Sequence, residues 1–274
     1  METVWKTLPD LDSRYEINDE QVSEFERNGH TQTLNLLHED EAATYRRIIA
    51  SAADRFNAEK RSLAARDTYG KAFLQIMNLW RVDDGVKKFV LAKRFAHIAA
   101  KLLGVDNVRL YHDQALFKEP GGGPTPWHQD QNYWPLDTTK TITMWMPLVD
   151  IPNAEMGMLT VASGSHHNGN VFDFVISDES EDAFEKYVRD QRFPLVRPAA
   201  LRAGDATWHS GFTIHSAPGN DSDQMREVMT IIYYADGTKI AAPKHEFQEN
   251  DLKTWLGNKA PGALADSELN PLLC

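Results

Sequence analysis

The sequence predicts a mainly β fold of the sandwich or jelly-roll kind, with flanking helices on its N-terminal side. Beyond Gly104, short runs rich in β-branched and aromatic residues alternate with Gly, Pro, Asn and Asp, as strands alternate with turns. Before Gly104, apolar residues recur at spacings close to 3.6, the period of a helix face. The 274 residues contain no internal repeat or linker, so we expect a single domain over residues 1–274.

The first 104 residues are expected to be mainly helical. Two helices should begin near Asp19 and Asp40, where acidic residues precede amphipathic runs. A third predicted helix covers residues 84–103 and stops at Gly104, a residue type suited to the left-handed end of a helix. His38 stands just ahead of Asp40, and we interpret this pair as part of a helix cap rather than as metal ligands.

The predicted jelly-roll core spans residues 105–240. A helical, lid-like insertion at about 165–194 interrupts its strands, because residues 177–192 are acidic and carry one narrow apolar face. Residues 241–274 form a C-terminal extension. The glycine run 121–123 lacks the Lys and Ser/Thr of a phosphate-binding loop and is interpreted as a hinge. The predicted strands cover residues 108–118, 141–149, 158–162, 195–201, 206–209 and 226–234.

The composition excludes several classes of partner. The chain has 29 Lys and Arg against 40 Asp and Glu, a net charge of −11, so we expect neither a nucleic-acid nor a membrane-surface partner. No run approaches the ~18 apolar residues of a membrane helix, and the first residues do not resemble a secretory signal. The single cysteine, Cys274, allows no intrachain disulfide, which favours a cytoplasmic location. The choice between monomer and homodimer stays open.

One histidine–carboxylate pair lies in a context typical of a metal site. His128 and Asp130 follow a predicted strand and a loop rich in Gly and Pro. If the backbone is extended here, the two-residue period of a strand puts both side chains on the same face. Both would then point into one cavity as metal ligands.

A third ligand must come from elsewhere, and the segment 204–220 offers His209 and His215. We prefer His215, because it lies just before the turn-forming residues 218–220, where its strand would end at a barrel mouth. His209 is interpreted as a packed histidine close to the site. Two histidines and one carboxylate on one metal face are typical of non-haem Fe(II) oxygenases, although zinc could use the same ligands.

Arg226 opens the apolar strand 226–234, an unusual place for a charge unless an anion meets it. Together with the Trp-His128-Gln-Asp130-Gln-Asn-Tyr-Trp-Pro run, the later Gly-Asp and His215, and the segment 229–237, it resembles the phytanoyl-CoA dioxygenase-like family of Fe(II)/2-oxoglutarate oxygenases. The likeness runs from about residue 18 to 240. It implies a double-stranded β-helix with iron bound by His128, Asp130 and His215. It further implies 2-oxoglutarate chelating the iron, with Arg226 pairing with its distal carboxylate.

The resemblance also implies an activity. With O2, such an enzyme hydroxylates or otherwise oxidises a C–H bond of a small organic metabolite and releases succinate and CO2. Members of the family act on many secondary metabolites and amino acids, so the substrate stays open. The choice between hydroxylation, desaturation, epimerisation and ring formation stays open as well.

Three further residues match positions that contact the cosubstrate in members of this family: Gln114, Trp145 and Gln75. Some members place a serine two residues past the second histidine, where this chain has Ala217 beside Ser216. The resemblance therefore leaves open which residue assists the arginine.

Two other classes of function remain. A zinc-dependent hydrolase could use the same three ligands, with Arg226 binding a substrate anion. A non-catalytic metal-binding jelly-roll protein is the plainer alternative, but it gives no reason for three convergent ligands and an arginine. Succinate formation that depends on Fe(II) and 2-oxoglutarate would separate an oxygenase from both.

Several other side chains are interpreted as structural. His112 is expected to support the sheet, and His166 and His167 to lie on the loop before the insertion. Trp127 is interpreted as a core aromatic rather than as part of the site.

Overall fold

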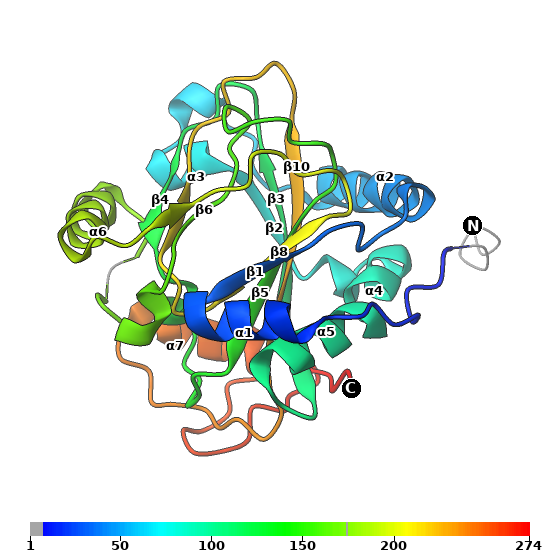
Figure 1. The fold of residues 1–274 in the computed structure, drawn as a ribbon, viewed down its shortest axis with the longest axis vertical. Helices are drawn as coiled ribbons and strands as arrows, with labels where there is room; N and C mark the ends of the chain where they lie inside the picture. The colour runs from blue at the N-terminus through cyan, green and yellow to red at the C-terminus, as the bar shows by residue number, and fades with distance from the viewer. Residues whose placement is uncertain (1–7, 174) are drawn as a thin grey trace.

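Two antiparallel β-sheets enclose a cavity in the computed structural model, which describes residues 8–173 and 175–274. The larger sheet has the strand order β1-β8-β5-β10-β3-β2, and the smaller sheet has the order β4-β9-β6-β7. In Figure 1 the smaller sheet lies on one side of the larger one, and helices cover the other side. This arrangement is the double-stranded β-helix, or jelly roll, that the sequence predicts.

The elements of the described residues have the following bounds. The larger sheet contains β1 (His30–Thr33), β8 (Ala206–Ser210), β5 (Thr141–Pro147), β10 (Arg226–Ala235), β3 (Val108–Lys118) and β2 (Leu74–Met77). The smaller sheet contains β4 (Thr125–His128), β9 (His215–Ala217), β6 (Thr160–Ala162) and β7 (Leu195–Val196). The α-helices are α1 (Asp19–Asn28), α2 (Glu39–Phe56), α3 (Thr68–Ala72), α4 (Asp84–Val90), α5 (Lys93–Leu103), α6 (Asp178–Gln191) and α7 (Glu246–Trp255). Among these helices, none is long and apolar enough to cross a membrane.

Strand β10 shows how one sheet serves both the core and the cavity. Met229, Ile231 and Tyr233 belong to the main apolar core, which they share with α2, α4 and α5. The alternating Thr230 and Ile232 line the cavity instead. Because side chains of a strand alternate between its two faces, the helix layer fixes which residues face the cavity.

Five of the six predicted strands are confirmed, with ends that differ by at most two residues. The sixth, predicted over 195–201, is wrong in length, because only Leu195 and Val196 pair with β6. Pro194 and Pro198 flank this pair, and proline has no N–H to donate to a strand ladder. Strands β1, β2 and β4 were not predicted, since each has only four residues.

The helix predicted over 84–103 is divided into α4 and α5, because Ala92 between them has an extended backbone. The break lets Phe89 and Phe95 pack in the same core with ring centroids 5.1 Å apart. Gly104 ends α5 in the left-handed conformation, as predicted. At α2 the predicted cap is confirmed, with the carboxylate of Glu41 accepting a hydrogen bond from the backbone N–H of His38 at 2.9 Å.

The predicted helix of the insertion is α6, which lies beyond β4 (Figure 1). Its residues Phe184 and Val188 pack in an apolar cluster with Trp127, which confirms Trp127 as a core aromatic. Of the insertion residues that the structure describes, Ile176 lines the cavity, whereas the residues of α6 do not. The part of the insertion next to the cavity is therefore the chain just ahead of the helix.

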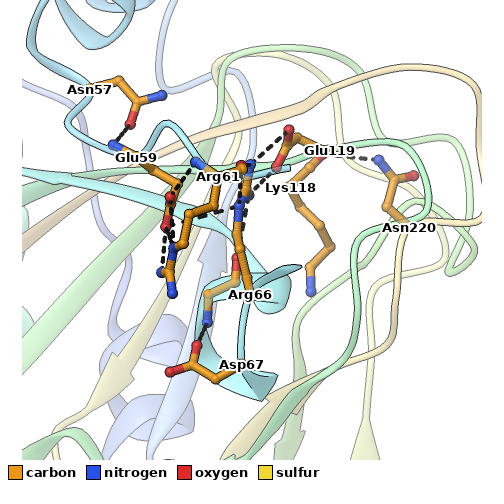
Figure 2. Close-up of polar contacts among 9 residues, drawn as sticks. Asn57, Glu59, Arg61, Arg66, Asp67, Lys118, Glu119 and Asn220 are labelled. Carbon is orange, nitrogen blue, oxygen red and sulfur yellow. Dashed lines mark hydrogen bonds and ion pairs between the residues drawn. The ribbon is translucent and has the colours of Figure 1, made fainter. Parts of the chain in front are cut away.

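An ion pair and hydrogen bonds hold the loop after β3, as Figure 2 shows. Buried Arg66 pairs with Glu119, and Asn220 donates its side-chain amide to the carbonyl of Lys118 at 3.0 Å. The glycines that follow donate their backbone N–H groups to carbonyls of neighbouring segments. The interpretation of residues 121–123 as a hinge stays a prediction, while in this structure the loop is hydrogen-bonded on more than one side.

Candidate metal centre and cavity

The space between the two sheets is a cavity of about 230 Å³. All the residues singled out from the sequence as candidate ligands or cosubstrate contacts reach its wall. These residues are His128, Asp130, His215, Arg226, Gln114, Trp145 and Gln75.

The three predicted ligands converge at one point. His128 ends β4 and His215 begins β9, and the two residues are direct partners in the antiparallel ladder. Each imidazole Nε2 lies 3.6 Å from Oδ1 of Asp130, and the potential ligand atoms all lie within 4.8 Å of one another. Gln129 between the two residues is extended, as expected, so Asp130 lies on the same side as His128 before the chain enters a 3-10 turn.

Backbone carbonyls set the orientation of both imidazoles. Nδ1 of His128 lies 2.7 Å from the carbonyl oxygen of Pro126, and Nδ1 of His215 lies 2.9 Å from that of Thr213. A carbonyl can only accept, so each Nδ1 carries the hydrogen and donates it. Each Nε2 is left with a lone pair directed at the convergence point, as a metal ligand requires. Burial, and then the neighbouring imidazole of His128, lower the pKa of His215 well below its usual value.

Asp130 is held by its second carboxylate oxygen. Its Oδ2 accepts a hydrogen bond from the hydroxyl of Thr143 at 2.8 Å and lies 3.3 Å from Nε2 of His209. Burial alone would raise the pKa of Asp130, but the nearby imidazoles, that of His215 above all, hold it well below its usual range. His209 is therefore a packed histidine that orients the carboxylate, as predicted, and Oδ1 stays available to a metal.

Arg226 is 2% exposed and lies at another part of the cavity wall. Its guanidinium donates to the carbonyls of Gly157 at 2.9 Å and Leu116 at 3.3 Å, and stands 5.5 Å from the ring centre of Trp145. Burial lowers the pKa of Arg226 to about 9. It has no carboxylate within ion-pair distance among the described residues, so a buried positive charge here calls for an anion from outside the chain.

A second buried basic residue, Lys118, lies beside Arg226 and was given no role from the sequence. Lys118 is the cross-strand partner of Arg226, and its ammonium donates to the carbonyl of Gly123 and to the hydroxyl of Thr125. Burial, and then Arg226, lower the pKa of Lys118 to about 6. Figure 2 shows its side chain running away from the nearby Arg66–Glu119 pair. The sequence signal was its place two residues after Leu116, on the cavity face of β3.

The predicted cosubstrate contacts form a polar wall. The amide of Gln75 donates to the side-chain oxygen of Gln114 at 2.8 Å, and the hydroxyl of Tyr69 donates to Gln75 at 2.7 Å. Ser216 and Ala217 also line the cavity. This chain of neutral hydrogen bonds fixes the glutamines.

The opposite part of the wall was not foreseen. His112 lines the cavity, so its interpretation as sheet support was incomplete, and burial lowers its pKa to about 3. Its ring lies 5.5 Å from that of Trp255 on α7. Asp251, also on α7, lines the same part of the cavity and accepts a hydrogen bond from the hydroxyl of Tyr111 at 2.7 Å. Burial raises the pKa of Asp251 to about 7.

His166 and His167 lie outside the site, as predicted. They belong to a 3-10 turn before the insertion, and each Nε2 contacts a carbonyl near the end of α1. Both anchor that helix to the turn.

A family model and several known proteins match this chain. The family model described as phytanoyl-CoA dioxygenase matches residues 25–228. A probable alpha-ketoglutarate-dependent hypophosphite dioxygenase of Stutzerimonas stutzeri is 27% identical over 156 residues, which cover 56% of this chain and 54% of that protein. A phytanoyl-CoA dioxygenase of Arabidopsis thaliana is 27% identical over 167 residues, covering 60% of this chain and 57% of that protein. The chain thus spans little more than half the length of these relatives.

Solved structures share the fold over nearly the whole chain. The non-heme alpha-ketoglutarate-dependent carbocyclase SnoK from nogalamycin biosynthesis has a TM-score of 0.78 and 24% identity, covering 94% of this chain and 97% of its own. The epimerase SnoN, in complex with Fe3+, alpha-ketoglutarate and nogalamycin RO, has a TM-score of 0.75 and 26% identity, covering 93% and 98%. Alpha-ketoglutarate is another name for 2-oxoglutarate.

Proposed function

The chain belongs to the phytanoyl-CoA dioxygenase family, and we propose that it is an Fe(II)/2-oxoglutarate-dependent dioxygenase. Its reaction would oxidise a C–H bond of a small organic metabolite, with release of succinate and CO2. One observation carries the proposal. Two imidazoles and one carboxylate converge on a point in a cavity, and the buried Arg226 in the cavity wall has no carboxylate partner among the described residues.

The donor set fits the metal. Two neutral imidazole nitrogens and one carboxylate oxygen on one face leave the remaining positions of a six-coordinate ion to other ligands, as Fe(II) oxygenases require. Bound iron would supply the activation of O2, with 2-oxoglutarate providing the electrons. His128, Asp130 and His215 would hold the metal, and His209 and Thr143 would keep the carboxylate oriented.

The chain's own residues would position the cosubstrate. Arg226 offers its planar guanidinium to the distal carboxylate, whose two oxygens it matches in shape and charge. Gln75, Gln114 and Trp145 line the same cavity and would complete that wall, which supports the roles inferred for them from the family resemblance. Burial of the site excludes water and so strengthens the ion pair.

The net charge of −11 supports a protein without nucleic-acid or membrane partners, and the single cysteine supports a cytoplasmic location.

Succinate formation tests the proposal. Protein reconstituted with Fe(II) should convert 2-oxoglutarate to succinate in air, and a metabolite panel should contain a compound that accelerates this turnover and gains an oxygen atom or loses two hydrogens. Zinc-loaded protein and the Asp130→Ala variant are the matched controls and should produce none. Hydrolysis of a panel compound by the zinc form, without succinate from the iron form, would instead identify a hydrolase.

A further inference from the structure

A buried carboxylate lies at the far end of the cavity from Arg226. Asp251 is 9% exposed and contacts Tyr111 on β3, whereas Arg226 contacts Leu116 on the same strand. Five strand positions separate these contacts, which corresponds to about 16 Å along an extended chain. The metal ligands line the same cavity.

A β-bulge places the group that holds Asp251. The pairing of β10 with β3 passes from Ile232 opposite His112 to Tyr233 opposite Leu110, so Tyr111 is an extra residue in its strand. Such bulges redirect a side chain, and the ring of Tyr111 packs 5.4 Å from that of Trp134 while its hydroxyl donates to Asp251. The bulge in β3 therefore directs the hydroxyl of Tyr111 toward the carboxyl group of Asp251.

Asp251 has only neutral partners. Its hydrogen bonds come from the hydroxyl of Tyr111 and the indole of Trp255, and within the described residues it has no ion pair. Burial disfavours the charged form of this carboxyl group, and a cationic ligand in the cavity would stabilise that form.

The charges of the loaded site leave Asp251 unbalanced. The two positive charges of Fe(II) and the one of Arg226 equal the one negative charge of Asp130 and the two of 2-oxoglutarate. Asp251 is the remaining carboxylate among the described lining residues. Aromatic side chains, whose faces attract ammonium groups, line the same cavity. They are Tyr69, Tyr133, Trp134 and Trp255.

We propose that Asp251 binds a protonated amino group of the prime substrate, so that the enzyme oxidises a small organic amine or amino acid. The inference rests on the proposed function for the metal and the cosubstrate. In this arrangement the end of the cavity at Asp251 binds the cationic group of the substrate, and the end at Arg226 binds the dicarboxylate 2-oxoglutarate. The family match ends at residue 228, before α7, so Asp251 lies outside the matched residues.

Paired probes of one skeleton test the charge preference. 2-Phenylethylamine, 2-phenylethanol and phenylacetate, and the butyl compounds with the same three end groups, are titrated calorimetrically at pH 8 into protein loaded with Zn(II) and 2-oxoglutarate. The ammonium probes should bind at least about ten-fold more tightly than their alcohol and carboxylate counterparts. Asp251→Asn should lower ammonium affinity by at least about ten-fold and change alcohol affinity less than about three-fold.

Two further variants separate charge from packing. Glu249→Gln removes the same charge from an exposed position of α7 and should keep the preference. Tyr111→Phe removes the hydroxyl but keeps the carboxylate, and should also keep a preference of the same sign. If Asp251→Asn fails to fold, the probe series on the unaltered protein still decides.

Equal affinity for ammonium and alcohol probes, no binding by either, or a preference for the carboxylate would overturn the inference. So would an Asp251→Asn variant that retains the ammonium preference. Calorimetric binding of 2-oxoglutarate to the metal-loaded protein is measured in parallel. If the cosubstrate binds and no ammonium preference exists, the substrate inference fails alone; if the cosubstrate does not bind, the proposed function fails whatever the probes show.

Discussion

The two ends of the cavity each hold one buried charge that has no ion-pair partner among the described residues, but they are built in different ways. Arg226 projects from the start of β10, and its guanidinium rests on backbone carbonyls within the two-sheet frame. Asp251 projects from α7 and is held by a bulged tyrosine and an indole. The strand end lies inside the family match, and the helix end lies outside it.

This difference indicates a division of labour. In the proposed reaction, sheet residues, whose positions the ladder fixes, bind the cosubstrate that every turnover consumes. The substrate is bound by α7, which packs on the sheet through Leu252. The sheet end of the cavity thus offers the guanidinium of Arg226, and the helix end offers the carboxyl group of Asp251.

The largest effect is expected at the centre, on which both ends depend. His215→Ala should lower metal affinity by at least about a hundred-fold and abolish succinate formation, because two remaining ligands cannot hold the ion. Metal content after dialysis and succinate release measure this, with His38→Ala as the control that keeps both. A His215→Ala protein that retains one metal per chain would refute the ligand assignment.

Removing Arg226 should affect only the sheet end. Arg226→Ala should raise the 2-oxoglutarate concentration needed for half-maximal activity about thirty-fold to several thousand-fold, since a buried charge pair is worth roughly 2 to 5 kcal/mol. Arg226→Lys should recover little, because an ammonium cannot match the carboxylate in two prongs. Arg46→Ala, which removes a partly exposed arginine paired with Glu227, is the control. Unchanged dependence on 2-oxoglutarate with lost substrate affinity would move Arg226 to the substrate end.

At the helix end, Asp251 should make the free energy of unfolding depend on pH. Burial raises the pKa of Asp251 from 3.8 to about 7, so its stabilising contribution is complete below the unfolded value and is lost as pH rises through 7. The facing titratable groups, Tyr69, Tyr111 and Tyr133, have raised pKa values and stay neutral throughout.

We therefore compare the free energy of unfolding of Asp251→Asn with that of the unaltered metal-free protein. The difference should shift in favour of the variant by up to about 4 kcal/mol between pH 4 and pH 8. Urea unfolding at the two pH values measures the difference, and Glu249→Gln should show none. A difference that does not change with pH would mean that Asp251 is not desolvated.

The smallest effect is expected at His209. His209→Ala should keep the metal but lower its affinity about ten-fold, because Asp130 loses one of the two groups that orient it. Competition with a chelator measures this loss. Cosubstrate and amine binding should weaken together, since the change touches neither end; a selective loss at one end would place His209 there.

The sequence predicted the three side chains that converge at the candidate metal centre, because its signals are local. His128 and Asp130 are near neighbours in the chain, and His215 precedes a turn that ends its strand. Arg226 stood out because a charge at the head of an apolar strand conflicts with burial unless an anion is present. Lys118 ends its strand and shares a strand face with Gln114, but only the structure shows that this face lines the cavity.

The sequence by itself determined the class of fold, the three converging ligands and the arginine, because strand periodicity and turn residues act over a few neighbouring positions. Only the tertiary structure decided the far end of the cavity. Tyr111 faces Asp251 because of a bulge that depends on pairing with β10, and α7 is brought there by packing some 140 residues away in sequence. Neither the bulge nor the position of α7 leaves a local sequence pattern. Both depend on contacts between distant segments, which become favourable only after the sheet has formed.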